Sequence, residues 1–288
     1  MKMTSILLVL FAVFFIGCAS GPAVSEIEII TEDSVTEEVK NKPVKIVTTV
    51  YYPVKVESYF GDGVKDEYSI YSYDESGVLL FKEELFNAED TLQQSIVSKY
   101  VGKESSVRSI YNAAGNLLTY EKSLFDMNGN VTKNEKFDNK DFLQTISEYK
   151  YEDNLKSIWK VFNESGSLLS TTLYVYSDSG LIRIDSMSPG GELEEYFELI
   201  YDSNGILLEN NHYNSDGKIQ DSRYFEYTNG FLSMELLNRQ NGSVLRKIMY
   251  KNDQFGNPVE TIFMDAGDNV QERLITVYDS REEISYEK

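Results

Sequence analysis

One short turn phrase recurs along most of this sequence and limits what the chain can fold into. An aromatic residue is followed by Asp or Asn, two further residues, Gly, one more residue and an aliphatic residue, as in "YDSNGIL", which begins at Tyr201. An Asp or Asn side chain can accept a hydrogen bond from the backbone N–H two residues later, and Gly takes a positive φ without a Cβ penalty. The phrase therefore predicts a tight hairpin turn with a bulge, between strands whose aromatic and aliphatic residues pair.

Turn centres of this kind follow one another from about residue 44 to the end of the chain. They are about 13 residues apart, which leaves room for a strand of about eight residues and too little for a convincing helix. The sequence therefore predicts an all-β fold, an antiparallel meander of about 19 short strands joined by Asp/Asn-x-x-Gly turns. The expected turn centres are Gly63, Gly77, Asp90, Gly102, Gly115, Gly129, Asp141, Asn154, Gly166, Gly180, Gly191, Gly205, Gly217, Gly230, Gly242, Gly256 and Gly267, with an irregular one near Arg281.

Besides the turn spacing, the sequence has a second, longer period of about 76 residues. Tandem duplication of one structural unit produces such a period. It separates Gly115 from Gly191, and aromatic residues agree across it, such as Phe125 with Tyr201. Six strands fit into one period, and an even number of strands can duplicate without reversing the direction of a meander. We therefore expect six-strand blocks at roughly 35–110, 111–186 and 187–262, with a partial block at 263–288.

The strands differ in how apolar their faces are. The strand after Gly191 carries Leu193, Phe197 and Leu199 on one face, whereas the strand after Gly129 is polar on both faces. Such strands suit an open, twisted or spiralling repeat sheet that is partly wet on both faces and is stabilised between neighbours. A closed barrel with a dry interior fits less well, and a β-propeller would need a period of about 50 residues. A transmembrane barrel needs a continuous apolar outer band, which these charged strands do not supply.

The repeated phrase resembles the YD repeats of the RHS family and the related MORN-like hairpin repeats of bacterial surface proteins. The resemblance covers most of residues 44–288 and rests on the aromatic-Asp/Asn-x-x-Gly-x-aliphatic phrase. It implies a hairpin-repeat architecture and says almost nothing about activity. The Arg that often follows the Gly in that family is missing here, as in "GILL" and "GKIQ".

The first twenty residues have the pattern of an export signal, which would direct the chain to the cell envelope. Lys2 precedes an uninterrupted apolar run, Ile6–Ile16, which is typical of a signal peptide and too short for a permanent transmembrane helix. The run ends in Gly17 and Cys18, and this junction resembles the lipobox of bacterial lipoproteins. The resemblance implies cleavage between Gly17 and Cys18 and lipidation of Cys18. The alternative is an ordinary secretory signal that happens to contain a Cys.

Cys18 is the only Cys of the chain, so neither an intramolecular disulfide nor thiol catalysis is expected. We expect a lipoprotein signal peptide at 1–17, an acidic tether at 18–43 and a β-hairpin repeat domain at 44–288. The protein would be exported and anchored to a bacterial membrane through its N-terminal lipid. The absence of Asp after the Cys favours the outer membrane in a cell with two membranes, on either its periplasmic or its external face.

Charge and residue types argue against several kinds of activity. The formal net charge of −20 repels nucleic acid. His212, the only His, lies on a polar strand and is expected to be a solvated or sheet-face residue rather than a catalytic base. The acidic turns at Asp126 and Asp202 lack the downstream Glu of a calcium loop. Trp159 could stack on a sugar, although cross-strand packing also accounts for it. We predict no catalytic residue, no metal and no cofactor.

Three functions stay open. The first is a lipid-anchored, non-enzymatic envelope protein that presents a sheet surface to a protein or a glycan. The second is an envelope polysaccharide hydrolase that uses paired carboxylates, since acidic residues are abundant. The third is an envelope spacer or assembly factor. The strands between the repeated turns vary most between the six-strand blocks, so a recognition surface is expected there.

Overall fold

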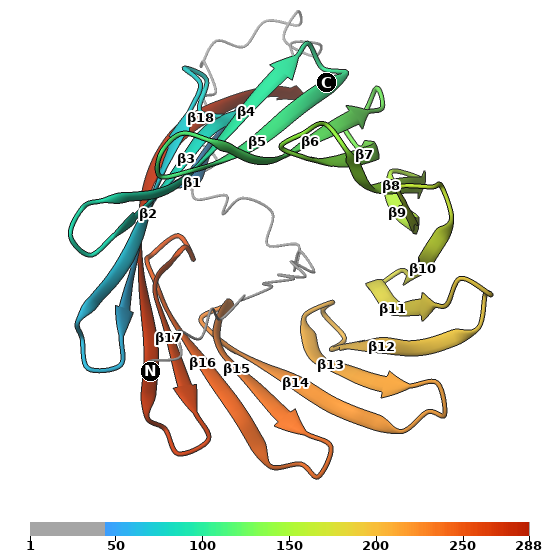
Figure 1. Ribbon diagram of the computed structural model, residues 1–288. Helices are drawn as coiled ribbons and strands as arrows, with labels where there is room; N and C mark the ends of the chain where they lie inside the picture. The colour runs from blue at the N-terminus through green and yellow to red at the C-terminus, as the bar shows by residue number, and fades with distance from the viewer. Residues whose placement is uncertain (1–43, 288) are drawn as a thin grey trace, which may run out of the picture.

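The computed structural model describes residues 44–287, which form eighteen antiparallel β-strands in one sheet. The strands follow one another around a ring (Figure 1), and none of these residues belongs to a helix. The strands are β1 (Val44–Phe60), β2 (Lys65–Tyr73), β3 (Leu80–Asn87), β4 (Leu92–Val101), β5 (Ser105–Asn112), β6 (Leu117–Phe125), β7 (Val131–Asp138), β8 (Leu143–Glu152), β9 (Leu155–Asn163), β10 (Leu168–Ser177), β11 (Gly180–Met187), β12 (Leu193–Tyr201), β13 (Leu207–Asn214), β14 (Ile219–Thr228), β15 (Phe231–Arg239), β16 (Val244–Asn252), β17 (Pro258–Asp265) and β18 (Val270–Glu287).

The sheet is closed into a barrel. Each strand pairs with its neighbours in sequence, and β1 pairs with both β2 and β18 (Figure 1). The all-β antiparallel meander therefore agrees with the sequence prediction. The predicted open, twisted or spiralling sheet is wrong, and the chain forms 18 strands in the described range rather than about 19.

Closure depends on the two longest strands. β1 and β18 pair along their lengths, from Val44 opposite Glu287 to Phe60 opposite Glu272. An open sheet would leave two rows of unpaired backbone groups at its edges, and closure removes both rows. No local pattern in the sequence identifies a partner at the other end of the described chain, which is why the open sheet was expected. The turn predicted near Arg281 is wrong for the same reason, because this segment continues β18 opposite Val50.

The predicted turn chemistry is present in the hairpins. At Asp202 the carboxylate Oδ1 accepts hydrogen bonds from the backbone N–H groups of Asn204 (2.8 Å) and Ile206 (2.9 Å), and Gly205 has a φ of 79°. The register of the two strands shifts by one residue at Tyr201, as a bulge requires. At the turn predicted around Gly267, the residue with positive φ is Asp268 (63°).

The barrel is wet on both faces because it is wide. No described side chain is less than 2% exposed, although a few residues are buried. Side chains fill the interior of a barrel of about eight strands, whereas 16 to 18 strands leave water-filled space. Strands that are polar on both faces, from which the sequence predicts an open sheet, therefore fit a closed barrel of this size equally well.

The two faces of the barrel wall differ in exposure. Along the second half of β8, Glu148, Lys150 and Glu152 are exposed, whereas Tyr149 and Tyr151 between them are half-buried. A closed sheet crowds the side chains on its concave face and separates those on its convex face. We therefore call the face of Tyr149 the inner face and the face of Glu148 the outer face.

The best-packed part of the wall lies on the inner face of β11–β13. Ile184, Leu199 and Leu207 are each 4–6% exposed, and Phe197 and Tyr201 pack against them. Ile184 lies directly opposite Phe197 across the ladder, so the cluster is built from cross-strand pairs. It is a local core in one sector rather than a filled barrel interior.

Tyrosine hydroxyls fasten one rim of the barrel. On several even-numbered strands, near the strand end or, in β18, at its middle, a Tyr hydroxyl donates to a backbone carbonyl 20 residues earlier, at or near the start of the preceding strand. We call these contacts the tyrosine latches. They join Tyr100 to Leu80 (3.3 Å), Tyr151 to Val131 (2.9 Å), Tyr176 to Lys156 (3.0 Å), Tyr201 to Leu181 (2.8 Å) and Tyr278 to Pro258 (3.3 Å).

Candidate functional site

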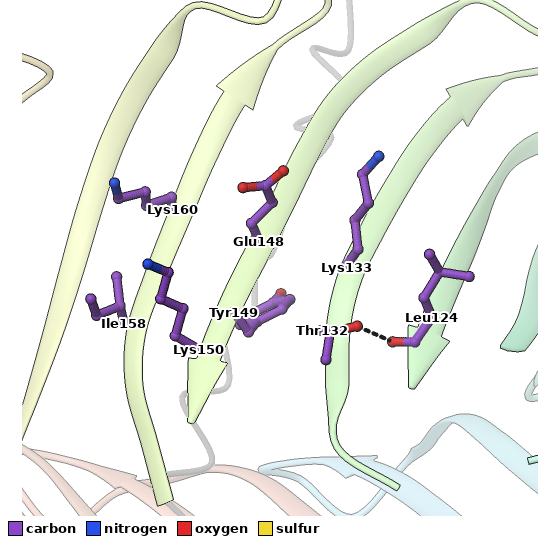
Figure 2. A pocket seen from close by; sticks show the side chains of 8 residues that line it. All are labelled: Leu124, Thr132, Lys133, Glu148, Tyr149, Lys150, Ile158 and Lys160. Atoms are coloured by element: carbon purple, nitrogen blue, oxygen red, sulfur yellow. Dashed lines mark hydrogen bonds between the residues drawn. The ribbon is translucent and has the colours of Figure 1, made fainter. Parts of the chain in front are cut away.

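A groove of about 320 Å³ lies on the wall formed by β6–β9. Each of these four strands contributes side chains to the lining. Lining residues on neighbouring strands lie opposite each other in the ladder: Lys133 is opposite Glu148, and Glu148 is opposite Lys160. Figure 2 shows Glu148 between Lys160 on one side and Lys133 on the other. We call this site the lysine groove, and its lining residues are Leu124, Thr132, Lys133, Glu148, Tyr149, Lys150, Ile158 and Lys160.

The charges in the lysine groove are mostly without ion-pair partners. Lys133 pairs with Glu135 at 2.7 Å, but within residues 44–287 no ion pair involves Lys150, Lys160 or Glu148. Lys150 and Lys160 lie on neighbouring strands, diagonal to each other, because Lys150 is opposite Ile158 and Lys160 is opposite Glu148. Diagonal neighbours on a sheet face are within reach of long side chains. The groove thus offers two ammonium groups side by side.

Other stretches of the outer face pair their charges within the wall. Glu57 on β1 binds both Lys55 (2.9 Å) and Lys65 (3.1 Å), and Arg183 on β11 binds Asp185 (2.7 Å). Such pairs satisfy the charges on the surface of the sheet itself. Lys150 and Lys160 make no such pair, in a protein whose net charge is −20.

The three groove lysines are specific to one part of the chain. No basic residue occurs at the positions one block length before and after them; five of these six positions lie on strands that hold the same place in the order of six, and Asp74 lies directly after β2. A barrel wall of the same build therefore forms without these lysines. The counterparts are Glu57 and Glu209 for Lys133, Asp74 and Glu226 for Lys150, and Glu84 and Leu236 for Lys160.

The groove also has an apolar part. Leu124 on β6 is 49% exposed, and Ile158 on β9 lines the other side. Thr132 donates its hydroxyl hydrogen to the backbone carbonyl of Leu124 at 3.3 Å, which holds the wall between them (Figure 2). A bound molecule would therefore meet both charge and hydrocarbon surface, as small-molecule sites usually provide.

His212 lies on the inner face of β13, four strands along the ladder from β9 of the groove. Its ring nitrogens contact Asp221 (2.9 Å, Nδ1) and Glu195 (3.1 Å, Nε2), and the ring stacks on Phe197 with centroids 4.5 Å apart. The imidazole thus links three strands, β12–β14, and both nitrogens are already engaged. This placement is that of a sheet-face residue and gives no partner with the character of a nucleophile.

In the acidic turns, the Asp carboxylates accept hydrogen bonds from groups of the same turn. Asp126 accepts hydrogen bonds from the backbone N–H groups of Asn128 and Asn130, both at 2.9 Å, and from the Asn130 side chain at 3.0 Å. The side-chain bond from Asn130 and these N–H groups lower the pKa of Asp126. Among the described residues, no three His, Cys, Asp or Glu side chains are grouped so as to hold a metal ion.

Trp159 packs on the inner face against Tyr149, its direct cross-strand partner, with ring centroids 6.0 Å apart and planes 14° from parallel. Its indole N–H is buried and has no acceptor within the described residues. Burial raises the pKa of Tyr149 and lowers that of Lys156 nearby, which lies over the Tyr149 ring. The aromatic pair is therefore part of the wall packing.

Sequence reasoning did not single out any residue of the lysine groove. The sequence predicts a recognition surface only on the strands that vary between the six-strand blocks. A comparison of Lys133, Lys150 and Lys160 with their counterparts in the other blocks is the signal that could have found the groove. Gly17 and Cys18 lie outside the described residues, so cleavage and lipidation there stay predictions. Residues 44–287 contain no helix that is long and apolar enough to cross a bilayer.

Comparison with known proteins places the chain in no family. No protein-family model and no curated protein sequence matches it. A porin-like protein from Bacteroides uniformis ATCC 8492 is 15% identical, covering 88% of this chain and 95% of its own, with a TM-score of 0.40. A porin-like protein from Bacteroides vulgatus ATCC 8482 is 10% identical over 78% of this chain and 98% of its own, with a TM-score of 0.33.

The Photorhabdus luminescens Tc holotoxin pore is 12% identical, covering 78% of this chain and 15% of its own, with a TM-score of 0.22. At these identities and TM-scores, none of the three likenesses carries an argument about function. The recognition of YD/RHS-like or MORN-like repeats is wrong, because the hairpins close into an 18-stranded barrel and no family model matches, and no comparison supports the lipoprotein part of that recognition.

Proposed function

We propose that this protein is an exported, non-enzymatic barrel of the cell envelope that binds a partner through the lysine groove. The observation that carries the proposal is the position of the groove. Its lysines occur where the six-strand blocks differ, and two of them have no ion-pair partner within the described wall. Charges that the fold does not need and does not pair are available to a ligand.

The signal-like run Ile6–Ile16 supports export of the chain. The outer face supports an aqueous rather than a lipid environment for the barrel wall, because it carries ion pairs such as those of Glu57 with Lys55 and Lys65. Charged groups on the lipid-facing side of a membrane barrel are destabilising. Binding from an aqueous part of the envelope is therefore the role that these features favour.

A hydrolase acting on polysaccharide has less support. Such enzymes need two carboxylates across the bond that is cleaved. Glu148 is the one carboxylate that lines the groove, and nearby Glu135 is already paired with Lys133. We therefore propose binding without turnover.

The experiment that tests this function compares groove and control variants of the full-length protein. Lys133→Glu, Lys150→Glu and Lys160→Leu introduce the residues that stand one block length later, so the wall keeps side chains that the same fold already uses. The control changes three exposed lysines without ion pairs, Lys99→Glu, Lys103→Glu and Lys218→Leu, and alters the net charge equally.

We expect envelope extract from the source cell to yield a saturable ligand for the wild-type and control proteins, and at least a tenfold loss of affinity for the groove variant. The proposal fails if the groove variant binds as well as the wild type while circular dichroism shows the same fold.

Anchoring through Cys18 is tested separately, by radiolabelled palmitate incorporation into the wild type and into Cys18→Ser. Equal labelling of the two would exclude lipidation at this residue.

A further inference from the structure

The ligand chemistry of the lysine groove can be narrowed further, on the basis of the proposed function. We propose that the groove binds an acidic saccharide, with its anionic group between Lys150 and Lys160 and its hydroxyl groups on Glu148. Each part of this proposal rests on a separate group in the groove.

The ammonium groups of Lys150 and Lys160, which have no ion-pair partner, favour an oxyanion as the ligand group between them. Lys150 and Lys160 are diagonal neighbours on the sheet face, so one carboxylate, phosphate or sulfate can lie within reach of both. Charge-assisted hydrogen bonds of this kind are stronger than neutral ones. The net charge of −20 disfavours a long polyanion, so a small anionic group within a mostly neutral molecule fits better than a nucleic acid.

Glu148 excludes ligands that are acceptors only. Its carboxylate lies between the cross-strand positions of Lys133 and Lys160 yet pairs with neither (Figure 2). An ionised carboxylate accepts hydrogen bonds and donates none. A ligand that places its anion beside the lysines must therefore offer hydroxyl or amine donors a few ångströms away, which an acidic sugar does and inorganic phosphate at neutral pH does poorly.

Leu124 and Ile158 supply the remaining contact. Both present hydrocarbon at the groove, and Leu124 is half exposed. A sugar ring has an apolar C–H face beside its hydroxyl edge, so it can lie against such residues while its polar groups reach Glu148 and the lysines. The volume of about 320 Å³ is at the lower end for small-molecule sites and suits a short saccharide unit whose chain continues out of the groove.

An acidic protein segment is the main competing ligand, and the groove fits it less well. Stable protein interfaces bury about 1,200 Å² or more of surface. Within the groove, Lys150 and Lys160 have no ion-pair partner, and Lys133 beside them is already paired with Glu135. A compact ligand uses these groups fully, whereas an extended acidic surface would face the acidic remainder of the barrel.

The test is isothermal titration of the full-length, detergent-solubilised protein with defined probes. The probes are a neutral oligosaccharide that ends in a single galacturonate, the same oligosaccharide with that carboxyl group reduced to an alcohol, the same oligosaccharide with a single sulfate in place of the carboxylate, inorganic phosphate and a polyglutamate peptide. We expect one of the two acidic saccharides to bind on the order of tenfold or more tightly than the neutral and phosphate probes, which corresponds to about 1.4 kcal/mol. The tighter of the two identifies the anionic group.

Variants separate the roles of the groups. Lys150→Glu with Lys160→Leu should abolish saccharide binding, while Lys99→Glu with Lys218→Leu should leave it unchanged. Glu148→Ala should weaken the saccharide and leave or improve phosphate binding, because the hydroxyl acceptor is lost and a negative charge is removed. A uniform improvement for all anions in Glu148→Ala would overturn the assignment of Glu148.

Failure of this proposal can be told from failure of the proposed function. If neither acidic saccharide binds, or if polyglutamate binds more tightly than both, the ligand class is wrong. Lysine-dependent binding of envelope extract would then still support the groove as the binding site. If the extract binds equally well to the groove variant, both proposals fall.

Discussion

The aspartates that open the hairpin turns hold their carboxylates against backbone N–H groups. In Asp74, Asp202 and Asp265 the pKa is lowered, chiefly by the N–H of Leu79, Ile206 and Asn269 respectively. A carboxylate whose pKa is lower in the folded state stabilises that state while it is ionised. This contribution is present above the unfolded value, near pH 3.8, and is lost as the pH falls toward the folded value.

We therefore predict that Asp74→Asn, Asp202→Asn and Asp265→Asn together reduce the acid sensitivity of the fold. An Asn Oδ1 makes the same turn bonds, as Asn163 and Asn214 do in this protein, but it does not titrate. Urea midpoints at pH 7 and pH 3 should differ less in the variant than in the wild type. Glu152→Gln, Glu194→Gln and Glu226→Gln, at exposed sites, serve as the control. If the control reduced the pH difference just as much, the turn bonds would not be the cause.

Two neighbouring glycines make a matched test of close packing at the junction of β1 and β18. A Cβ on Gly61 would lie 1.9 Å from the backbone oxygen of Val270, whereas a Cβ on Gly63 (φ 85°) meets nothing within 4 Å. Gly63→Ala should cost about 1 kcal/mol of stability through backbone strain. Gly61→Ala should cost about 3 kcal/mol, because the strand or its partner must move. Equal losses, measured by urea denaturation, would show that the close approach is not a constraint.

Among the secondary-structure elements, the tyrosine latches join each even-numbered strand that carries one to the strand before it. Burial raises the pKa of both Tyr151 and Tyr176, in keeping with hydroxyls that stay protonated and donate. We predict that Tyr151→Phe lowers the free energy of unfolding by about 1 kcal/mol, the usual net value of one hydrogen bond.

The control for the latch is Tyr224→Phe, since the described contacts give the Tyr224 hydroxyl no hydrogen bond. Its loss should be only a few tenths of a kcal/mol, within the range of surface substitutions. Thermal or urea denaturation of both variants measures the difference. Two equal losses would mean that the ring packing, rather than the hydroxyl, accounts for the effect at Tyr151.

The joined ends of β1 and β18 are held by contacts with turns on either side. Arg281 donates to the backbone oxygen of Gly77 at 2.7 Å, and Tyr52 packs on Tyr73 with ring centroids 4.7 Å apart. On the other side Tyr51 stacks on Phe255 at 4.8 Å. These contacts connect the closing strands to the β2–β3 and β16–β17 turns, so closure is supported by side chains as well as by the ladder.

At the scale of the whole molecule, the sequence predicts the features that depend on short stretches of chain, such as the turns, and misses closure of the sheet, which depends on residues far apart. The turns are decided within five or six residues, by an Asp or Asn at one end and a residue that tolerates positive φ at the other, and the predicted centres from Gly63 to Gly267 fall at or beside the connections between strands. Closure is decided between β1 and β18, which lie at opposite ends of the described chain. Nothing in either strand alone distinguishes an edge strand from one that has a partner on both sides.

The candidate site was predictable only as a region. Lys133, Lys150 and Lys160 belong to three different strands, and their proximity depends on the registers of β7 with β8 and of β8 with β9. The block comparison could flag these positions as variable, but not that Lys150 and Lys160 lack ion-pair partners. That property depends on which side chains the closed wall places beside them.

Closure of the sheet is the central claim, because the inner and outer faces and the placement of the groove follow from it. Its most direct test is a disulfide between β1 and β18, with Thr49→Cys and Glu282→Cys in a Cys18→Ser background. These two residues lie opposite each other in the ladder. Directly opposed residues on paired strands have Cα atoms within the range that a disulfide bridges.

The measurement is the loss of free thiols in the monomer at low protein concentration under mild oxidation, with Thr49→Cys and Glu226→Cys as the control pair. The closed barrel predicts an intramolecular disulfide in the first pair and free thiols in the second. Free thiols in both pairs, or disulfides that form only between molecules, would contradict closure and restore the open sheet.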